Sequence, residues 1–236
     1  MKIIKLCEKE HHINSTQNIQ LGALEYYRSH EKLEIKDPSE GKWSKHVERP
    51  EPTAYSAEEF KKFGLGGGTA TIITKTINIE NEASNVYIFC TTKMESGVDQ
   101  DLVIKQYCKD KGYNSSYEIK DPQKFAEKIQ ELLLRKLLEL HPEKTALSII
   151  CCHREVRYVD KRETKFDNLS EVSPYTYEET LEMVFTKTKD FEKEKEYRFA
   201  WFVLDEKGIP FETKEYIRIN AIPLRKFSNK FRGQYT

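Results

Sequence analysis

The sequence predicts an α+β fold, in which a single domain carries a mainly antiparallel sheet and one long central helix. Three observations support this prediction. Short β-branched and aromatic runs occur in both halves of the chain, only one long segment has helical periodicity, and no shift in composition divides the 236 residues. We therefore expect one domain over residues 1–236.

The long predicted helix covers residues 121–140. Asp121 is a favourable N-cap, and Pro122 suits the first helical position. Apolar side chains then recur at helical spacing before His141-Pro142 ends the run, at Phe125, Ile129, Leu132, Leu133, Leu137 and Leu140. We expect this apolar side to pack across the sheet.

Predicted strands lie on both sides of this helix. β-Branched and aromatic residues favour strands at residues 2–7, 19–27, 69–79 and 85–91, the last two paired around an Asn-Glu-Ala-Ser turn. Further strands are expected at residues 146–152, 155–160, 197–204 and 215–221, with a short helix at 177–185. The order of elements gives the mainly antiparallel sheet.

The polar segment at residues 42–68 is predicted to be a mobile loop within the domain. It follows a turn at Asp37-Pro38-Ser39-Glu40-Gly41, contains Pro50 and Pro52, and ends in Gly64-Leu65-Gly66-Gly67-Gly68. The glycine run lacks the Lys-Ser/Thr pair of a phosphate-binding loop, so a hinge or lid is favoured over a nucleotide cradle.

The charge balance limits the classes of partner. Lysine plus arginine and aspartate plus glutamate both number 39, which gives zero formal net charge, so nucleic acid is not indicated as a partner. The start MKIIKLCEKEHH does not resemble a signal peptide, and no long apolar run follows. We expect a cytoplasmic protein without a membrane segment, whose partner is a small molecule or another protein.

Cysteine and histidine spacing favours neither a disulfide framework nor a metal site. The five cysteines show no Cys-x-x-Cys pair, which is typical of reduced thiols. His11 and His12 are adjacent, so they cannot both point to one ligand on regular structure. No metal is expected.

The most informative stretch is Glu194-Lys195-Glu196-Tyr197-Arg198, which directly precedes an apolar run at residues 199–203. The charged run at 187–195 is expected to be solvated, so Glu196 and Arg198 lie where water gives way to the core. On a strand, Glu194, Glu196 and Arg198 project from one face. They form either a ligand site or an ion-pair ladder with partners such as Lys187 and Arg28.

Three segments resemble a widespread family of bacterial proteins of unknown function. They are Leu21-Gly22-Ala23-Leu24-Glu25-Tyr26-Tyr27-Arg28, then Ile35-Lys36-Asp37-Pro38-Ser39-Glu40-Gly41, then Lys187-x-x-x-Phe191-x-x-Glu194-x-Glu196-Tyr197-Arg198-Phe199. The family's hallmark is the late lysine, an aromatic residue and Glu-x-Glu-Tyr-Arg. This resemblance supports the fold and the position of a site, but it does not imply a reaction.

A second resemblance does suggest chemistry. ADP-ribosyltransferases of the Arg-Ser-Glu type carry an early arginine, a middle Ser/Thr-x-Ser/Thr and a late Glu/Gln-x-Glu, and here Arg28, Thr69-Ala70-Thr71 and Glu194-Lys195-Glu196 occur in that order. The resemblance implies NAD as the substrate, Glu196 and Glu194 as catalytic carboxylates, and Arg28 as the pyrophosphate clamp. The expected substrate-binding residues are Arg28, Tyr26, Asp37, Glu40, Thr69, Thr71, Lys187, Tyr197 and Arg198.

Three functions from different classes remain open, and the sequence does not decide whether the protein is an enzyme. The first is an NAD- or nucleotide-dependent transferase that serves as a bacterial toxin, effector or phage-defence factor. The second is a non-catalytic module that binds a ligand or a protein around Arg28, Asp37, Glu40 and Arg198. The third is a metal-dependent nuclease that uses Asp37, Glu40, Glu194 and Glu196.

Overall fold

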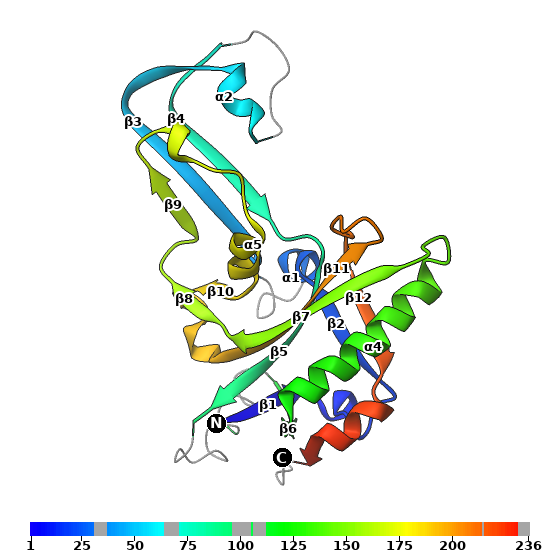
Figure 1. Cartoon of the computed structure of the whole chain (residues 1–236). Helices are drawn as coiled ribbons and strands as arrows, with labels where there is room; N and C mark the ends of the chain where they lie inside the picture. The colour runs from blue at the N-terminus through cyan, green and yellow to red at the C-terminus, as the bar shows by residue number, and fades with distance from the viewer. Residues whose placement is uncertain (31–36, 64–70, 96–104, 106–111, 214, 231–236) are drawn as a thin grey trace.

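A computed structural model of the chain describes residues 1–30, 37–63, 71–95, 105, 112–213 and 215–230. The fold is mixed α/β with a mostly antiparallel sheet, which confirms that part of the predicted fold class. Figure 1 shows a body built on a large sheet and an arm that projects from it. No helix in the described ranges combines the length and apolar character needed to cross a membrane.

The large sheet is antiparallel throughout its described part, and strand β5 lies at its centre. One run of strands is β12 (Tyr216–Asn220), β2 (Asn18–Ala23), β5 (Val86–Met94), β1 (Lys2–Cys7), β6 (Ser115–Ile119) and β13 (Ser228–Lys230). On the other edge of β5, β11 (Glu196–Asp205) pairs with β5 and with β7 (Leu147–Glu155).

Strands β1 and β2 share one edge of β5 and leave a gap between them. β1 pairs with β5 only as far as Ile4, opposite Thr92, whereas β2 begins to pair at Gly22, opposite Ile88. Residues 89–91 therefore have β11 on one side and neither β1 nor β2 on the other. We call this gap the sheet split.

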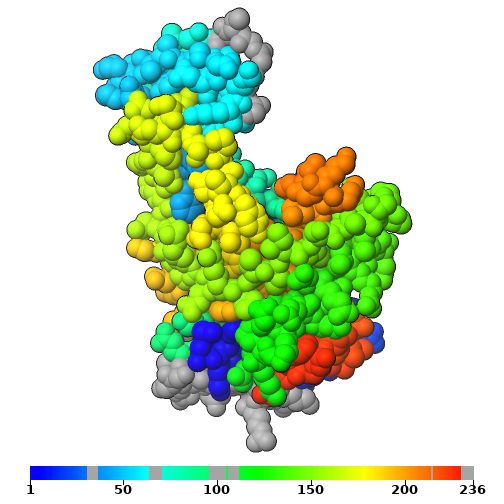
Figure 2. All heavy atoms as spheres, viewed as in Figure 1, coloured from blue at the N-terminus to red at the C-terminus, as the bar shows by residue number. Residues whose placement is uncertain are grey.

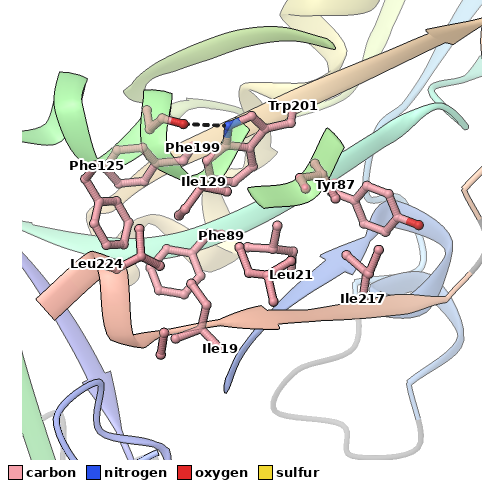
Figure 3. Packing of buried hydrophobic residues seen from close by; sticks show 14 of the residues in the cluster. Ile19, Leu21, Tyr87, Phe89, Phe125, Ile129, Phe199, Trp201, Ile217 and Leu224 are labelled. Carbon is pink, nitrogen blue, oxygen red and sulfur yellow. Dashed lines mark hydrogen bonds between the residues drawn. The ribbon is translucent and has the colours of Figure 1, made fainter. Parts of the chain in front are cut away.

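Helix α4 (Pro122–Leu140) covers one face of the large sheet, as its periodicity predicts. The Asp121 carboxylate accepts a hydrogen bond from the Lys124 amide at 3.1 Å, which confirms the predicted N-cap. The indole N–H of Trp201 donates to the Ala126 carbonyl of the helix at 3.1 Å. Figure 3 shows the apolar cluster between helix and sheet, which includes Ile19, Leu21, Phe89, Phe125, Ile129, Phe199, Trp201, Ile217 and Leu224.

The opposite face of the sheet is covered by two further helices and a small parallel sheet. Its apolar contacts come from α1 (Leu24–Ser29) and α5 (Tyr177–Val184), which pack on β5 and β11 through Leu24, Val184 and Phe185. The small sheet joins β8 (Arg157–Val159) to β10 (Thr186–Thr188). Short 3₁₀ helices complete the described connections, namely η1 (Lys9–His11), η2 (Leu169–Glu171), η3 (Lys189–Glu194) and η4 (Ile222–Phe227).

The arm consists of residues 42–61, 71–82 and 163–166, and its structure differs from the predicted loop. Residues 42–61 form β3 (Lys42–Ser56) and α2 (Ala57–Lys61), so the loop prediction is wrong there, and residues 64–68 lie outside the described ranges. β3 can be polar because only three of its fifteen residues are buried. Its backbone pairs with antiparallel β4 (Thr71–Glu82), the next strand along the chain, and with parallel β9 (Glu163–Phe166), which is remote in sequence. Figure 2 shows the arm standing clear of the body.

A buried lysine joins the arm to the body. The Lys45 ammonium on β3 contacts Glu179 of α5 at 2.7 Å and donates to the Ser173 carbonyl at 3.0 Å. It also lies over the Tyr175 ring, 4.2 Å from the centroid. Because an unpaired buried charge is costly, these contacts fix the root of the arm against α5.

Three other predicted features differ from the structure. β4 pairs with β3 in the arm and not with β5, so the expected pairing of residues 69–79 with 85–91 is wrong. The strand expected at 19–27 ends at Ala23, where the chain leaves β5 and α1 begins. Two α-helices in the described ranges, α4 and α5, exceed seven residues, so one long central helix is not confirmed.

The burial of Leu133 in helix α4 gives a stability prediction. Its side chain is fully buried, so Leu133→Ala should lower the free energy of unfolding by about 2–5 kcal/mol through lost burial and the cavity that remains. Leu140→Ala on the same helix is the matched control, because that side chain is 53% exposed. Equal effects of the two variants in urea denaturation would contradict the packing.

Candidate functional site

The candidate site is built around Arg198, which is completely buried at the start of β11. Its Nε donates to Glu196 Oε1 at 2.6 Å, and its Nη1 donates to Glu40 Oε1 at 2.8 Å. The same Nη1 also donates to the carbonyl of Val184, at the end of α5. One guanidinium thus ties together β11, α5 and the turn before β3.

Lys187 supplies a second buried cation. Its ammonium lies 3.1 Å from Glu196 Oε2, 2.8 Å from Glu194 Oε2 and 3.8 Å from Glu40 Oε2. The two cations and three carboxylates form one connected group, which we call the buried ion network: Arg198, Lys187, Glu196, Glu40 and Glu194. The expectation that residues 187–195 are solvated is wrong at Lys187, because it lies on β10 at the edge of the core.

The backbone conformation of Lys195 places the side chains of Glu194 and Glu196 against the same ammonium, that of Lys187. Glu194 ends η3 and Glu196 begins β11, so the expected arrangement on a single strand is wrong for Glu194. Between them Lys195 has a φ of 43°, in the left-handed region that is uncommon for a residue with a side chain. This bend allows both carboxylates to reach Lys187.

The network keeps its carboxylates ionised although they are buried. Burial alone would raise the pKa of Glu196, but the charges of Arg198 and Lys187 outweigh it and hold that pKa well below its usual range. The same balance lowers the pKa of Glu40. Burial alone would lower the pKa of Lys187, but the surrounding glutamates raise it well above its usual value. Glu196 is therefore a fixed negative charge at neutral pH.

A second pair of charges holds the turn that carries Glu40. Arg162 Nη2 contacts Asp37 Oδ2 at 3.1 Å, and Arg162 Nη1 donates to the Ser39 carbonyl. Burial raises the pKa of Asp37, with Glu40 adding to the rise and Arg162 opposing it. Arg28 donates to the Glu40 carbonyl at 2.9 Å. These contacts position Glu40 from both sides.

A cleft of about 730 Å³ opens beside the network and reaches into the sheet split. Its inner wall carries carboxylates and the ammonium of Lys187, and its sides carry aromatic rings. The lining includes Lys5, Tyr26, Tyr27, His30, Glu40, Phe89, Cys90, Tyr113, Tyr117, Lys187, Glu194, Glu196 and Arg218. Its mixed polar and aromatic lining suits a small polar ligand that carries a ring.

The lining of the cleft includes a group of aromatic side chains and a group of ionisable ones. Tyr26 hydrogen-bonds His30 at 2.9 Å and meets the ring of Tyr216 edge-on at 5.5 Å between centroids. Glu8, Glu10 and His11 also line the cleft, and they place their ligand atoms within 4.8 Å of one another. These three side chains have the chemistry to hold a divalent cation. The sequence analysis considered His11 only together with His12, and it did not consider Glu8 or Glu10.

The structure brings together five of the predicted site residues in the lining of the cleft, which are Tyr26, Glu40, Lys187, Glu194 and Glu196. Arg198 and Asp37 lie behind this wall and hold it. Arg28 does not line the cleft, because its guanidinium is occupied by the Glu40 carbonyl and by Glu82 at 3.6 Å.

Two predicted residues lie elsewhere in the described structure. Tyr197 faces the α4 side of the sheet, where its hydroxyl contacts His153 Nδ1 at 2.7 Å, because neighbouring residues on a strand alternate between faces. Thr71 is exposed at the far end of the arm, opposite Ser56, because β4 pairs with β3. Thr69 lies outside the described ranges.

Sequence analysis missed Lys5, Cys90 and Tyr158, which meet the network or the cleft. The Lys5 ammonium donates to the Cys90 carbonyl at 2.8 Å, and the Glu196 amide donates to the Tyr158 hydroxyl at 2.8 Å. Each lies in an ordinary strand pattern, so only the pairing of remote strands reveals it.

Comparisons with protein families, curated proteins and solved structures found no match.

The lowered pKa of Glu40 predicts a pH-dependent contribution to stability. Glu40→Gln should lower the free energy of unfolding by about 3–5 kcal/mol at pH 7, because it leaves buried cations less compensated. A carboxyl with a lowered folded pKa contributes stability above its unfolded pKa of about 4.3, and loses it as the pH falls toward the folded value. The gap between wild type and variant should therefore shrink below that pH.

Urea denaturation between pH 7 and pH 3 measures this gap. Glu51→Gln is the control, because Glu51 is exposed on the arm and should stay near wild type at every pH. A gap between wild type and Glu40→Gln that stays constant down to pH 3 would contradict the proposed role of the ionised carboxylate.

Proposed function

We propose that the cleft binds NAD and that the protein cleaves the bond between ribose and nicotinamide, passing ADP-ribose to a protein or a small acceptor. The observation that carries the proposal is the Glu196 carboxylate, which lines the cleft, is 96% buried and is held between Arg198 and Lys187. Glu194 adds a second carboxylate to the same wall.

The chemistry of NAD cleavage needs a fixed negative charge. When the glycosidic C–N bond breaks, its electron pair goes to the nicotinamide nitrogen, which becomes neutral, and positive charge develops on the ribose. The leaving group therefore needs no proton, so a carboxylate that cannot protonate at neutral pH is suited to the step. Glu196 would stabilise the cationic ribose, and the acceptor would then attack and lose its proton to solvent.

The network meets the physical conditions for such stabilisation. A charge acts more strongly where water is excluded, and it must already be in place before the reaction. Arg198 fixes one Glu196 oxygen and Lys187 fixes the other. A carboxylate has about four acceptor positions, so these bonds leave capacity for a ribose hydroxyl.

A non-catalytic binding module is the second candidate, and one observation favours it. Both Glu196 oxygens already contact protein cations, as they would in a purely structural ion pair. The nuclease has no comparable support, because Asp37, Glu40, Glu194 and Glu196 all face protein cations with which a divalent metal would have to compete.

The test is nicotinamide release from NAD by the purified protein, compared among three variants. Glu194→Gln should reduce release about 100-fold or more if that carboxylate assists the cationic transition state. It should leave the melting temperature within a few degrees, because the Glu194 side chain is 25% exposed and Lys187 keeps Glu196 and Glu40 as partners. Glu192→Gln, an exposed change on the same 3₁₀ helix, should keep full activity.

Glu196→Gln separates catalysis from folding only if stability is measured alongside activity. We expect loss of activity together with a loss of about 3–5 kcal/mol in the free energy of unfolding, because the variant removes a buried charge partner. NAD binding without turnover by the wild type would favour the binding module. Wild-type activity in Glu194→Gln would contradict the assigned role of that residue.

A further inference from the structure

The sheet split exposes a piece of β5 backbone to the cleft. The Lys93 amide donates to the Lys195 carbonyl, on the β11 side. Backbone groups alternate between the two edges of a strand, so the N–H and C=O of Cys90 point to the opposite edge, into the split. Neither β1 nor β2 pairs with Cys90 there.

Lys5 supplies a cation at the same point. Its ammonium donates to the Cys90 carbonyl at 2.8 Å and lies 4.6 Å from the centre of the Phe89 ring. Among the described residues, no carboxylate lies within ion-pair distance of this ammonium. An ammonium has three donors, and Lys5 lines the cleft. The split therefore holds a cation whose described protein partners are a neutral carbonyl and a ring.

Cys90 also connects the split to the buried ion network. Burial raises the pKa of the Cys90 thiol, and the nearby charge of Glu196 raises that pKa further. Across the strand pair, Cys90 of β5 lies opposite Arg198 of β11. The backbone of one residue thus faces the Lys5 cation while its side chain faces the Glu196 anion. A ligand lying along Cys90 would meet a positive group and a negative group in succession.

We infer that the Lys5 ammonium and the Cys90 amide bind an oxyanion of the ligand, namely a phosphate of a nucleoside 5′-phosphate whose ribose lies at Glu196. This assignment deepens the proposed function and rests on it for the identity of the ligand. A ribose 5′-phosphate unit carries its anionic group beside the sugar, which matches the order of Lys5, Cys90 and Glu196. Charge-assisted hydrogen bonds from an ammonium and an amide are a common way to hold phosphate.

This assignment gives the binding of the anion to Lys5 and Cys90, whereas the sequence analysis expected Arg28 in that role. Arg28 does not line the cleft, and its guanidinium already contacts two protein groups, the Glu40 carbonyl and Glu82. Arg218 also lines the cleft and would add positive charge, which Glu8 and Glu10 oppose. Lys5 is the discriminating residue, because its ammonium contacts the Cys90 carbonyl in the sheet split.

Calorimetric titration with inorganic pyrophosphate and with ADP-ribose tests the assignment. Lys5→Met keeps the apolar stem over Phe89 and removes the charge, so it should weaken both ligands about tenfold or more. Lys5→Arg should restore most of the affinity. Lys193→Met, an exposed change outside the cleft, should bind as wild type does. Equal affinity of wild type and Lys5→Met, or no binding by the wild type, would overturn the assignment.

Amide spectra of the ¹⁵N-labelled wild type give a second measurement that does not depend on the folding of a variant. Pyrophosphate should shift the Cys90 amide resonance, and an unchanged resonance at saturation would overturn the assignment. The two proposals fail separately. Pyrophosphate binding that depends on Lys5 without nicotinamide release would retain the oxyanion site and reject NAD cleavage. Nicotinamide release by the wild type, together with unchanged ligand affinity in Lys5→Met, would support NAD cleavage and reject the oxyanion site.

Discussion

The structure depends on the charge of Arg198, which is buried within the large sheet. Moving a charge out of water costs several kcal/mol unless partners surround it. Glu196 on the same strand provides one partner, and Glu40 provides another only because the turn before β3 folds onto the sheet. Lys187 then balances the added negative charge. Each compensation fixes another segment, so the contacts that stabilise the fold also build the inner wall of the cleft.

This shared role changes how the carboxylates should be interpreted. A glutamate with a low pKa at the floor of a cleft is typical of an electrostatic catalyst, yet the same shift arises in a structural ion pair. Glu196 has both properties, because its oxygens contact protein cations while its residue lines the cleft. Glu194 is more informative, since it shares Lys187 but is partly exposed. Of these two carboxylates, only Glu194 can be substituted to test function without a large loss of stability.

Local patterns predicted the elements that depend on local chemistry. The capped, periodic helix α4 and the apolar strands β1, β5, β7 and β11 were recognisable because their residue types favour those structures in any context. Two glutamates of the charged motif line the candidate cleft, and the prediction that Lys187 is their ion-pair partner is confirmed. β3 was missed because its polar sequence lacks a strand pattern of its own, and its strand structure comes from pairing with β4 and with the distant β9. Lys5 and Cys90 were missed because the sheet split arises from the pairing of three strands with β5, which no single segment encodes.

The place of β11 between β5 and β7 has a consequence for the order of folding. Residues 196–202 pair with residues 86–92, so the centre of the sheet is closed by segments more than a hundred residues apart. Such distant pairings carry a large loop-closure cost and are generally slow to form. During synthesis the chain contains β1, β2 and β5 well before β11 brings in Glu196 and Arg198. The charged wall of the cleft can form only after most of the chain has been made, and chains truncated before β11 would lack it.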